Sequence, residues 1–140
     1  MIKILLADDH AIFREGIASL LQSDTTFELV AEATGGDEAW QLIQRHVPDV
    51  AILDISMPVL NGIEVASQLK KTGLRTRVVL LTSHDDPTLT LQADEAGVTG
   101  YILKEDSFDK LALAIMAVHC GGQFMSLQVA CKLMEFLNLS

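Results

Sequence analysis

The alternation of short apolar runs with stretches of helical periodicity constrains the fold of this chain most strongly. The apolar runs cover residues 2–7, 28–33, 50–53, 78–81 and 101–103, and the run at 28–33 is the weakest. They are rich in Val, Ile and Leu and are continuous rather than alternating with polar residues, which is typical of strands buried on both faces of a parallel sheet.

The gaps between these runs carry apolar residues at helical spacing. In the first gap the pattern is formed by Phe13, Ile17, Leu20 and Leu21, and in the second by Ala39, Leu42 and Ile43. Asn61 with Glu64 predicts a capping box, Pro87 predicts a helix start, and Ser107 predicts a helix cap. Five strand–helix repeats in about 118 residues predict a doubly wound α/β domain with a five-stranded parallel sheet.

The residues after position 118 follow a different pattern. His119-Cys120-Gly121-Gly122 predicts the end of a helix and a turn, and Ser126 opens a sixth helical pattern. Its apolar stripe is Val129, Leu133, Phe136 and Leu137. We therefore divide the chain into a domain at 1–118 and a linker with an extra C-terminal helix at 119–140. The stripe could cover the domain's own core, but we favour a dimer or interdomain role because the five-strand unit is complete without it.

Charge and cysteine content narrow the classes of function. Nineteen acidic residues against ten Lys and Arg give a net charge of −9, which disfavours direct binding of this chain to nucleic acids or anionic membranes. No apolar run approaches the roughly 20 residues of a membrane span. The only cysteines, Cys120 and Cys131, are too few for a disulfide scaffold. We expect them to be buried, reduced thiols in a cytoplasmic protein.

Polar residues follow four of the five apolar runs. They are Asp8-Asp9, Asp54, Thr82-Ser83 and Lys104. The carboxyl ends of parallel strands meet at one edge of a sheet, where ligands of such folds bind. Singly, each residue is better explained as a helix cap, a turn residue or a solvated charge. Their coincidence at matching strand ends favours a site.

Three carboxylates at one sheet edge repel one another, and Lys104 offsets only part of their charge. A hard divalent cation, above all Mg²⁺, is the natural complement of carboxylate oxygens. Such a cation beside a lysine, a hydroxyl and a nucleophilic carboxylate suits phosphoryl transfer.

These residues also carry a family resemblance. Residues 5–10 (LLADDH), 53–62 (LDISMPVLNG), 79–83 (VLLTS) and 100–104 (GYILK) resemble the signature blocks of a two-component response-regulator receiver domain. Asp8-Asp9-His10, Arg14-Glu15-Gly16 and the sixth helix resemble its NarL/FixJ (LuxR-type) subfamily. The resemblance implies a flavodoxin-like receiver fold over nearly the whole chain.

The resemblance also implies a role for each site residue. Asp54 would accept a phosphoryl group from a sensor histidine kinase. The ligands of Mg²⁺ (or Mn²⁺) would be Asp8, Asp9, Asp54 and the backbone carbonyl of Ser56. Thr82 and Lys104 would then contact the phosphoryl oxygens, and Tyr101 would turn inward as a switch. One departure is Glu105, since many receivers carry proline after the lysine; a cis peptide bond here would cost about 2.5–4 kcal/mol.

By the same resemblance, the chain is a signalling domain rather than an enzyme, limited to self-phosphotransfer and autodephosphorylation. We expect a homodimer on phosphorylation, no membrane partner, and DNA binding only through a C-terminal helix-turn-helix domain absent from these residues. The alternatives are a natural stand-alone receiver acting through protein–protein contacts and an aspartate-nucleophile phosphatase. The phosphatase is disfavoured because its haloacid dehalogenase type separates two acids by one residue, whereas Asp8 and Asp9 are adjacent. No glycine fingerprint supports a nucleotide or flavin module.

Overall fold

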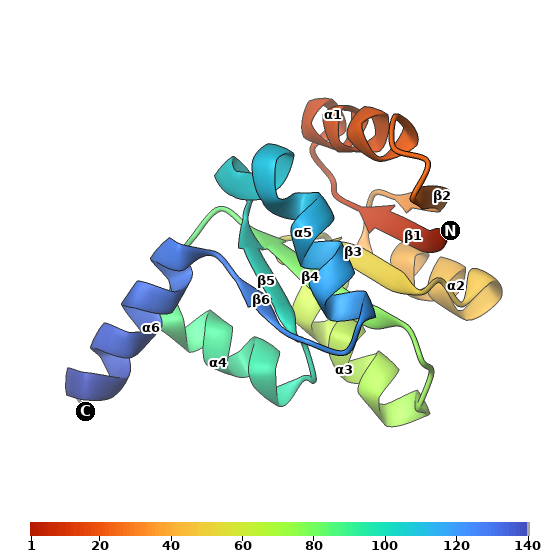
Figure 1. Cartoon of the computed structure of the whole chain (residues 1–140). Helices are drawn as coiled ribbons and strands as arrows, with labels where there is room; N and C mark the ends of the chain where they lie inside the picture. The colour runs from red at the N-terminus through yellow and green to blue at the C-terminus, as the bar shows by residue number, and fades with distance from the viewer. Residues whose placement is uncertain (140) are drawn as a thin grey trace.

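A computed structural model describes residues 1–139 of the chain and shows alternating strands and helices (Figure 1). The strands are β1 (Ile2–Ala7), β2 (Phe27–Ala33), β3 (Val50–Asp54), β4 (Arg77–Thr82), β5 (Gly100–Leu103) and β6 (Phe124–Met125). The helices are α1 (Ala11–Gln22), α2 (Gly36–His46), α3 (Gly62–Thr72), α4 (Pro87–Glu95), α5 (Ser107–His119) and α6 (Leu127–Leu139), with a 3₁₀ turn at Lys104–Asp106.

The strands form one parallel sheet in the order β2-β1-β3-β4-β5-β6, with helices on both faces. Successive strand residues point to opposite faces, so Leu5 joins the apolar core beneath α2, α3 and α4, whereas Leu6 joins the core beneath α1 and α5. β3 is buried at every position, as its continuous apolar sequence predicts. The doubly wound α/β prediction is confirmed.

The sheet differs from the sequence prediction at one edge, where a sixth strand extends the predicted five. Phe124 and Met125 pair in parallel with Gly100 and Tyr101. The Phe124 N–H donates to Thr99 O at 2.9 Å, and the Ser126 N–H donates to Tyr101 O at 3.0 Å. A two-residue strand is too short to produce a periodic pattern, which is why the sequence did not indicate it.

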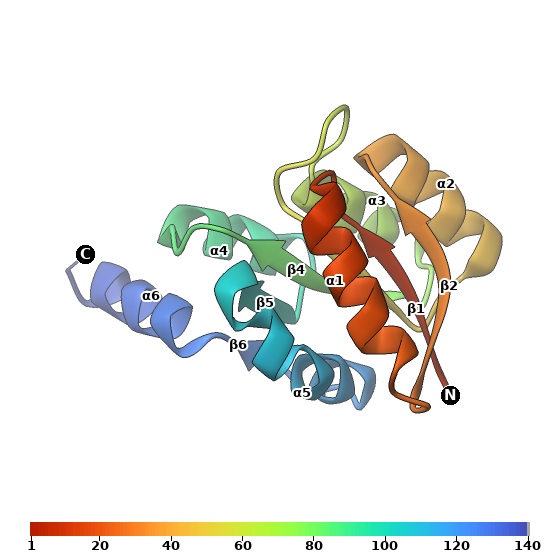
Figure 2. The same ribbon diagram turned by 90° about the horizontal axis from the view of Figure 1, so that it is seen from above.

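Helix α6 lies beside α4 in both views (Figures 1 and 2). Val129 is fully buried in the same core as Tyr101, and Leu133 is half-buried. Phe136 and Leu137 are 43% and 50% exposed. The first half of the predicted stripe therefore covers the domain's own core. An interdomain or dimer role for the second half stays a prediction, and Ser140, which ends the predicted segment 119–140, lies outside the described residues.

The predicted helix ends are confirmed in two places. The Asn61 side chain accepts from the Glu64 N–H at 2.8 Å, and the Glu64 carboxylate accepts from the Asn61 N–H at 2.9 Å. α4 begins at Pro87, and the Asp86 side chain accepts from the Thr88 N–H.

Two sequence predictions are wrong. Ser107 is not a cap but the first residue of α5, where its hydroxyl donates to Lys104 O at 2.5 Å and ties the helix to the preceding turn. Cys120 and Cys131 are exposed rather than buried, because Cys120 ends α5 and Cys131 lies on the outer side of α6. None of the helices among residues 1–139 combines the length and apolar character that crossing a bilayer requires.

Candidate functional site

Four strand ends bring polar side chains to one edge of the sheet. Asp8 follows β1, Asp54 ends β3, Thr82 ends β4 and Lys104 follows β5. Because β1, β3, β4 and β5 are consecutive neighbours in a parallel sheet, these residues lie at the same edge. β2 lies on the other side of β1 from β3, so the end of β2 lies outside this group of four strand ends.

A glycine lets the chain after β3 fold closely over the site. A Cβ on Gly62 would stand 2.6 Å from the backbone oxygen of Asp54, closer than any side chain tolerates. The Gly62 N–H donates to Ile55 O at 3.3 Å, which closes the loop. The loop after β3 therefore needs glycine at this position to begin α3 directly beside Asp54.

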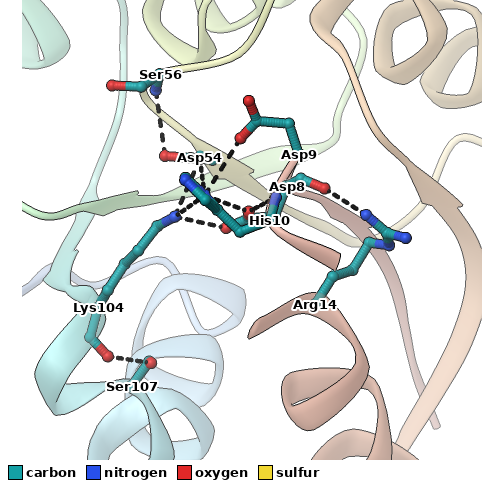
Figure 3. A network of polar contacts seen from close by, with 8 residues as sticks. All are labelled: Asp8, Asp9, His10, Arg14, Asp54, Ser56, Lys104 and Ser107. Carbon is teal, nitrogen blue, oxygen red and sulfur yellow. Dashed lines mark hydrogen bonds and ion pairs between the residues drawn. The ribbon is translucent and has the colours of Figure 1, made fainter. Parts of the chain in front are cut away.

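The acidic residues form a compact cluster (Figure 3). One ligand atom from each of Asp8, Asp9, His10 and Asp54 lies within 4.8 Å of the others. Asp8 and Asp54 are buried, whereas Asp9 is exposed. Three carboxylates and an imidazole at this spacing are a donor set that fits a divalent metal ion.

Lys104 is the cation that the structure places among these acids. Its Nζ atom lies 2.9 Å from Asp8 Oδ2 and 3.1 Å from Asp54 Oδ2. Although burial would lower it, the hydrogen bonds and charges of the two carboxylates raise the pKa of Lys104. The ring of Phe13 on α1 lies 4.9 Å from the ammonium and holds it over the site.

Asp54 is 1% exposed, and its carboxylate accepts two hydrogen bonds. The Ser56 N–H donates to Oδ1 at 3.1 Å, and Lys104 donates to Oδ2. Burial raises the pKa of Asp54, and the charge of Asp8 adds to the rise, whereas Ser56 and Lys104 offset part of it. The same burial limits the contact of the Asp54 carboxyl with bulk water.

His10 is a site residue to which the sequence patterns assigned no role of its own. Its Nδ1 atom lies 3.1 Å from Asp8 Oδ1, 3.3 Å from Asp9 Oδ1 and 3.7 Å from Asp54 Oδ2. Lys104 Nζ lies 3.0 Å from the same Nδ1 atom. The sequence signal that could have indicated this role is the position of His10 directly after Asp8-Asp9.

Arg14 was likewise not assigned a role from sequence. Its guanidinium donates to Asp8 O at 2.8 Å (Figure 3). The same group lies 3.5 Å from Glu32 on β2. Arg14 therefore fixes the backbone that carries the acidic pair to the start of α1.

Thr82 is buried at the end of β4, with its hydroxyl turned into the following loop. Its Oγ1 atom accepts from the His84 N–H and donates to His84 O, each at 3.1 Å. Thr82, Ser83, Leu103, Lys104 and Glu105 line one hollow of about 220 Å³ beside the cluster. Thr82 and Lys104 therefore border the same space.

Tyr101, for which the resemblance implies an inward turn when Thr82 moves, is buried on β5, the strand next to β4. Burial raises the pKa of its hydroxyl, and the nearby hydroxyls of Thr90 and Thr82 offset part of the rise. Its ring lines a cavity of about 220 Å³ that also borders Leu133 of α6. After Lys104, Glu105 enters the 3₁₀ turn, and every peptide bond among residues 1–139 is trans.

Comparison with known proteins identifies this arrangement. Residues 4–116 match the model of the response regulator receiver domain. The chain is 37% identical over 135 residues to the transcriptional regulatory protein LnrK of Bacillus subtilis, spanning 96% of this chain and 61% of LnrK. It is 41% identical over 133 residues to UhpA of Escherichia coli, spanning 95% of this chain and 66% of UhpA. The chain thus covers about three-fifths to two-thirds of the length of these relatives.

A solved structure agrees with the sequence comparisons. A LuxR-family two-component response regulator from Aurantimonas superposes with a TM-score of 0.90 at 32% identity, over 96% of both chains. The strand order, the acidic strand ends and these matches lead to one conclusion: the chain belongs to the response-regulator receiver family, and its relatives are regulators of the NarL/LuxR type.

Proposed function

We propose that this chain accepts a phosphoryl group on Asp54 from a sensor histidine kinase and changes conformation in response. The observation that carries the proposal is the position of Asp54, a buried carboxylate with Lys104 Nζ 3.1 Å from one oxygen. In the transfer, an Asp54 oxygen bonds to phosphorus, the phosphorus–nitrogen bond of the phosphohistidine breaks, and the kinase imidazole keeps the electron pair. The receiver acts as a signalling domain rather than as an enzyme with external turnover.

Asp8, Asp9, Asp54 and the backbone carbonyl of Ser56 would hold Mg²⁺ in this proposal. When bound, the ion supplies positive charge against the phosphoryl oxygens. Lys104 would supply a second positive charge, and Arg14 keeps the acidic pair in place. The burial of Asp54 limits the access of water to the reacting oxygen.

The conformational response would begin at Thr82. Its hydroxyl leaves the His84 backbone to donate to a phosphoryl oxygen across the hollow that it shares with Lys104. This movement changes the polar surroundings of the Tyr101 hydroxyl, and the Tyr101 side chain lines the cavity that residues of α4 and α6 also border. A local change of charge thereby biases a two-state element.

We further propose that the switch acts in the cytoplasm, promotes a homodimer and controls DNA binding through a separate C-terminal domain. LnrK and UhpA, named transcriptional regulatory proteins, support this output. Light scattering with and without beryllofluoride tests the dimer; an unchanged mass would favour a receiver that acts through other partners.

Phosphoryl labelling tests the central proposal. The chain is incubated with acetyl phosphate and Mg²⁺, and intact mass spectrometry should show one added phosphoryl group. Asp54→Asn should remove the label because the nucleophilic oxygen is lost. Asp109→Asn, an exposed acid on α5, is the matched control and should label normally. Equal labelling of Asp54→Asn would overturn the proposal.

A further inference from the structure

We propose that His10 is an additional ligand of the divalent ion and biases the site toward Mn²⁺ over Mg²⁺. The inference rests on the proposed function, since it concerns the same ion. The structure assigns the role because His10 Nδ1 is the ring atom aimed at the acidic cluster, within 3.1–3.7 Å of an oxygen from each of Asp8, Asp9 and Asp54.

Two neighbours make opposite demands on Nδ1. Lys104 Nζ lies 3.0 Å from Nδ1 and can only donate, whereas the Asp8 carboxylate, with Oδ1 3.1 Å from the same atom, accepts when ionised. In the tautomer with a lone pair on Nδ1, this lone pair and the carboxylate oxygens face one another, with a single ammonium to compensate them. A divalent cation among these four donor atoms would satisfy all of them at once.

The ring of His10 is not tied to the helix that the residue begins. Its backbone N–H donates to Asp8 Oδ1 at 2.7 Å, which fixes the residue beside the acidic pair. His10 is the N-cap residue of α1, but its side chain makes no capping hydrogen bond. The side chain is also 62% exposed, so it can retreat from the oxygens to admit an ion without disturbing the core.

The chemistry of imidazole sets the expected preference. Mg²⁺ prefers carboxylate, carbonyl and water oxygens, whereas first-row transition ions accept imidazole nitrogen readily. A site of carboxylates alone would discriminate weakly between Mg²⁺ and Mn²⁺. One nitrogen ligand raises the affinity for Mn²⁺ and adds little for Mg²⁺.

Metal titration of the full chain tests this inference. Isothermal titration of the chelator-treated protein would compare Mg²⁺ and Mn²⁺ for the parent, His10→Ala and His10→Gln. His10→Ala should weaken Mn²⁺ binding about tenfold or more and Mg²⁺ binding by no more than about threefold. His10→Gln, which offers oxygen, should keep Mg²⁺ binding and lose the Mn²⁺ preference. His46→Ala, in the last turn of α2, is the matched control and should change neither affinity.

A spectroscopic readout makes the outcome independent of phosphoryl transfer. Electron spin-echo spectra of the Mn²⁺-loaded parent should show coupling to an imidazole nitrogen, and His10→Ala should lack it. Equal loss of both affinities in His10→Ala, tighter Mn²⁺ binding, or no nitrogen coupling in the parent would overturn the inference and leave metal-dependent labelling of Asp54 intact. A parent chain that binds neither ion would overturn the proposed metal site as well.

Discussion

At the scale of single residues, the buried carboxylate of Asp54 opposes folding. Asp54 lies at the carboxyl end of β3, next to Asp8. Burial raises the pKa of Asp54 even though Lys104 offsets part of the rise. A carboxyl whose pKa is higher in the folded than in the unfolded chain binds protons preferentially in the folded state. The ionised form therefore destabilises the fold at pH values above the raised pKa. This free-energy cost disappears as the pH falls toward 3.8, the ordinary pKa of the carboxyl.

Asp54→Asn should accordingly stabilise the metal-free protein near neutral pH, because the neutral amide does not carry the cost of the buried charge. The gain should shrink as the pH falls through the raised pKa of Asp54 and vanish below the pKa of the unfolded chain. Urea unfolding with chelator present, at several pH values, measures this dependence. Asp109→Asn should show no such trend, and a loss of stability in Asp54→Asn near neutral pH would contradict the prediction.

At the scale of secondary-structure elements, α6 is held to the domain by a few inward contacts. Val129 lies in the core, the Ser126 hydroxyl accepts from the Leu103 N–H at 3.0 Å, and Gln128 donates to Asp85 Oδ2 at 2.8 Å. These contacts join the start of α6 to the end of β5 and to the loop before α4. The helix therefore begins beside the elements that the proposed switch would move.

Val129→Ala should destabilise the protein by about 1.6 kcal/mol, since it removes two buried methyl groups at about 0.8 kcal/mol each. Leu127→Ala on the same helix is the matched control, because Leu127 is 79% exposed and should contribute within about 0.5 kcal/mol. Denaturant unfolding of both variants checks the difference. Equal effects would show that α6 does not pack on the core through Val129.

At the scale of the whole molecule, the two ends of the sheet serve different purposes. The acidic site lies at the carboxyl ends of the strands, whereas the opposite end holds a cavity of about 370 Å³ bordered by Lys70, Arg75 and Arg77. Arg77 donates to Val118 O at 2.9 Å and to His119 O at 3.0 Å, and Lys70 donates to Glu95 O at 2.8 Å. Cations here cap the last carbonyls of α4 and α5, which stabilises the fold.

Arg77→Ala should cost about 1 kcal/mol of stability, because the last carbonyls of α5 lose charged donors at a partly exposed position. Labelling of Asp54 should be unchanged, since the substitution is at the other end of the sheet. Arg75→Ala borders the same cavity and serves as the control, with a cost within about 0.5 kcal/mol. Thermal unfolding and mass spectrometry on the same samples separate the two effects; loss of labelling in Arg77→Ala would contradict this division.

The amino-acid sequence by itself determined the first five strands, the starts of α3 and α4 and the polar residues that follow the strands. The strands are revealed by local apolar runs, and the Asn61–Glu64 capping box and the start of α4 at Pro87 depend on residues a few positions apart. The convergence of Asp8, Asp54 and Lys104 followed from one general property, that parallel strands end at the same edge.

Only the tertiary structure decided the sheet order, the strand β6, the exposure of the cysteines and the approach of His10 to the acids. The order places β1 between β2 and β3, which brings Asp8 beside Asp54. β6 exists because β5 offers free backbone groups to two residues that have no pattern of their own. His10 reaches the cluster, and Lys104 reaches His10 across 94 positions of the chain, through packing. Local periodicity reports which face of an element is buried, whereas these features depend on which distant elements meet there.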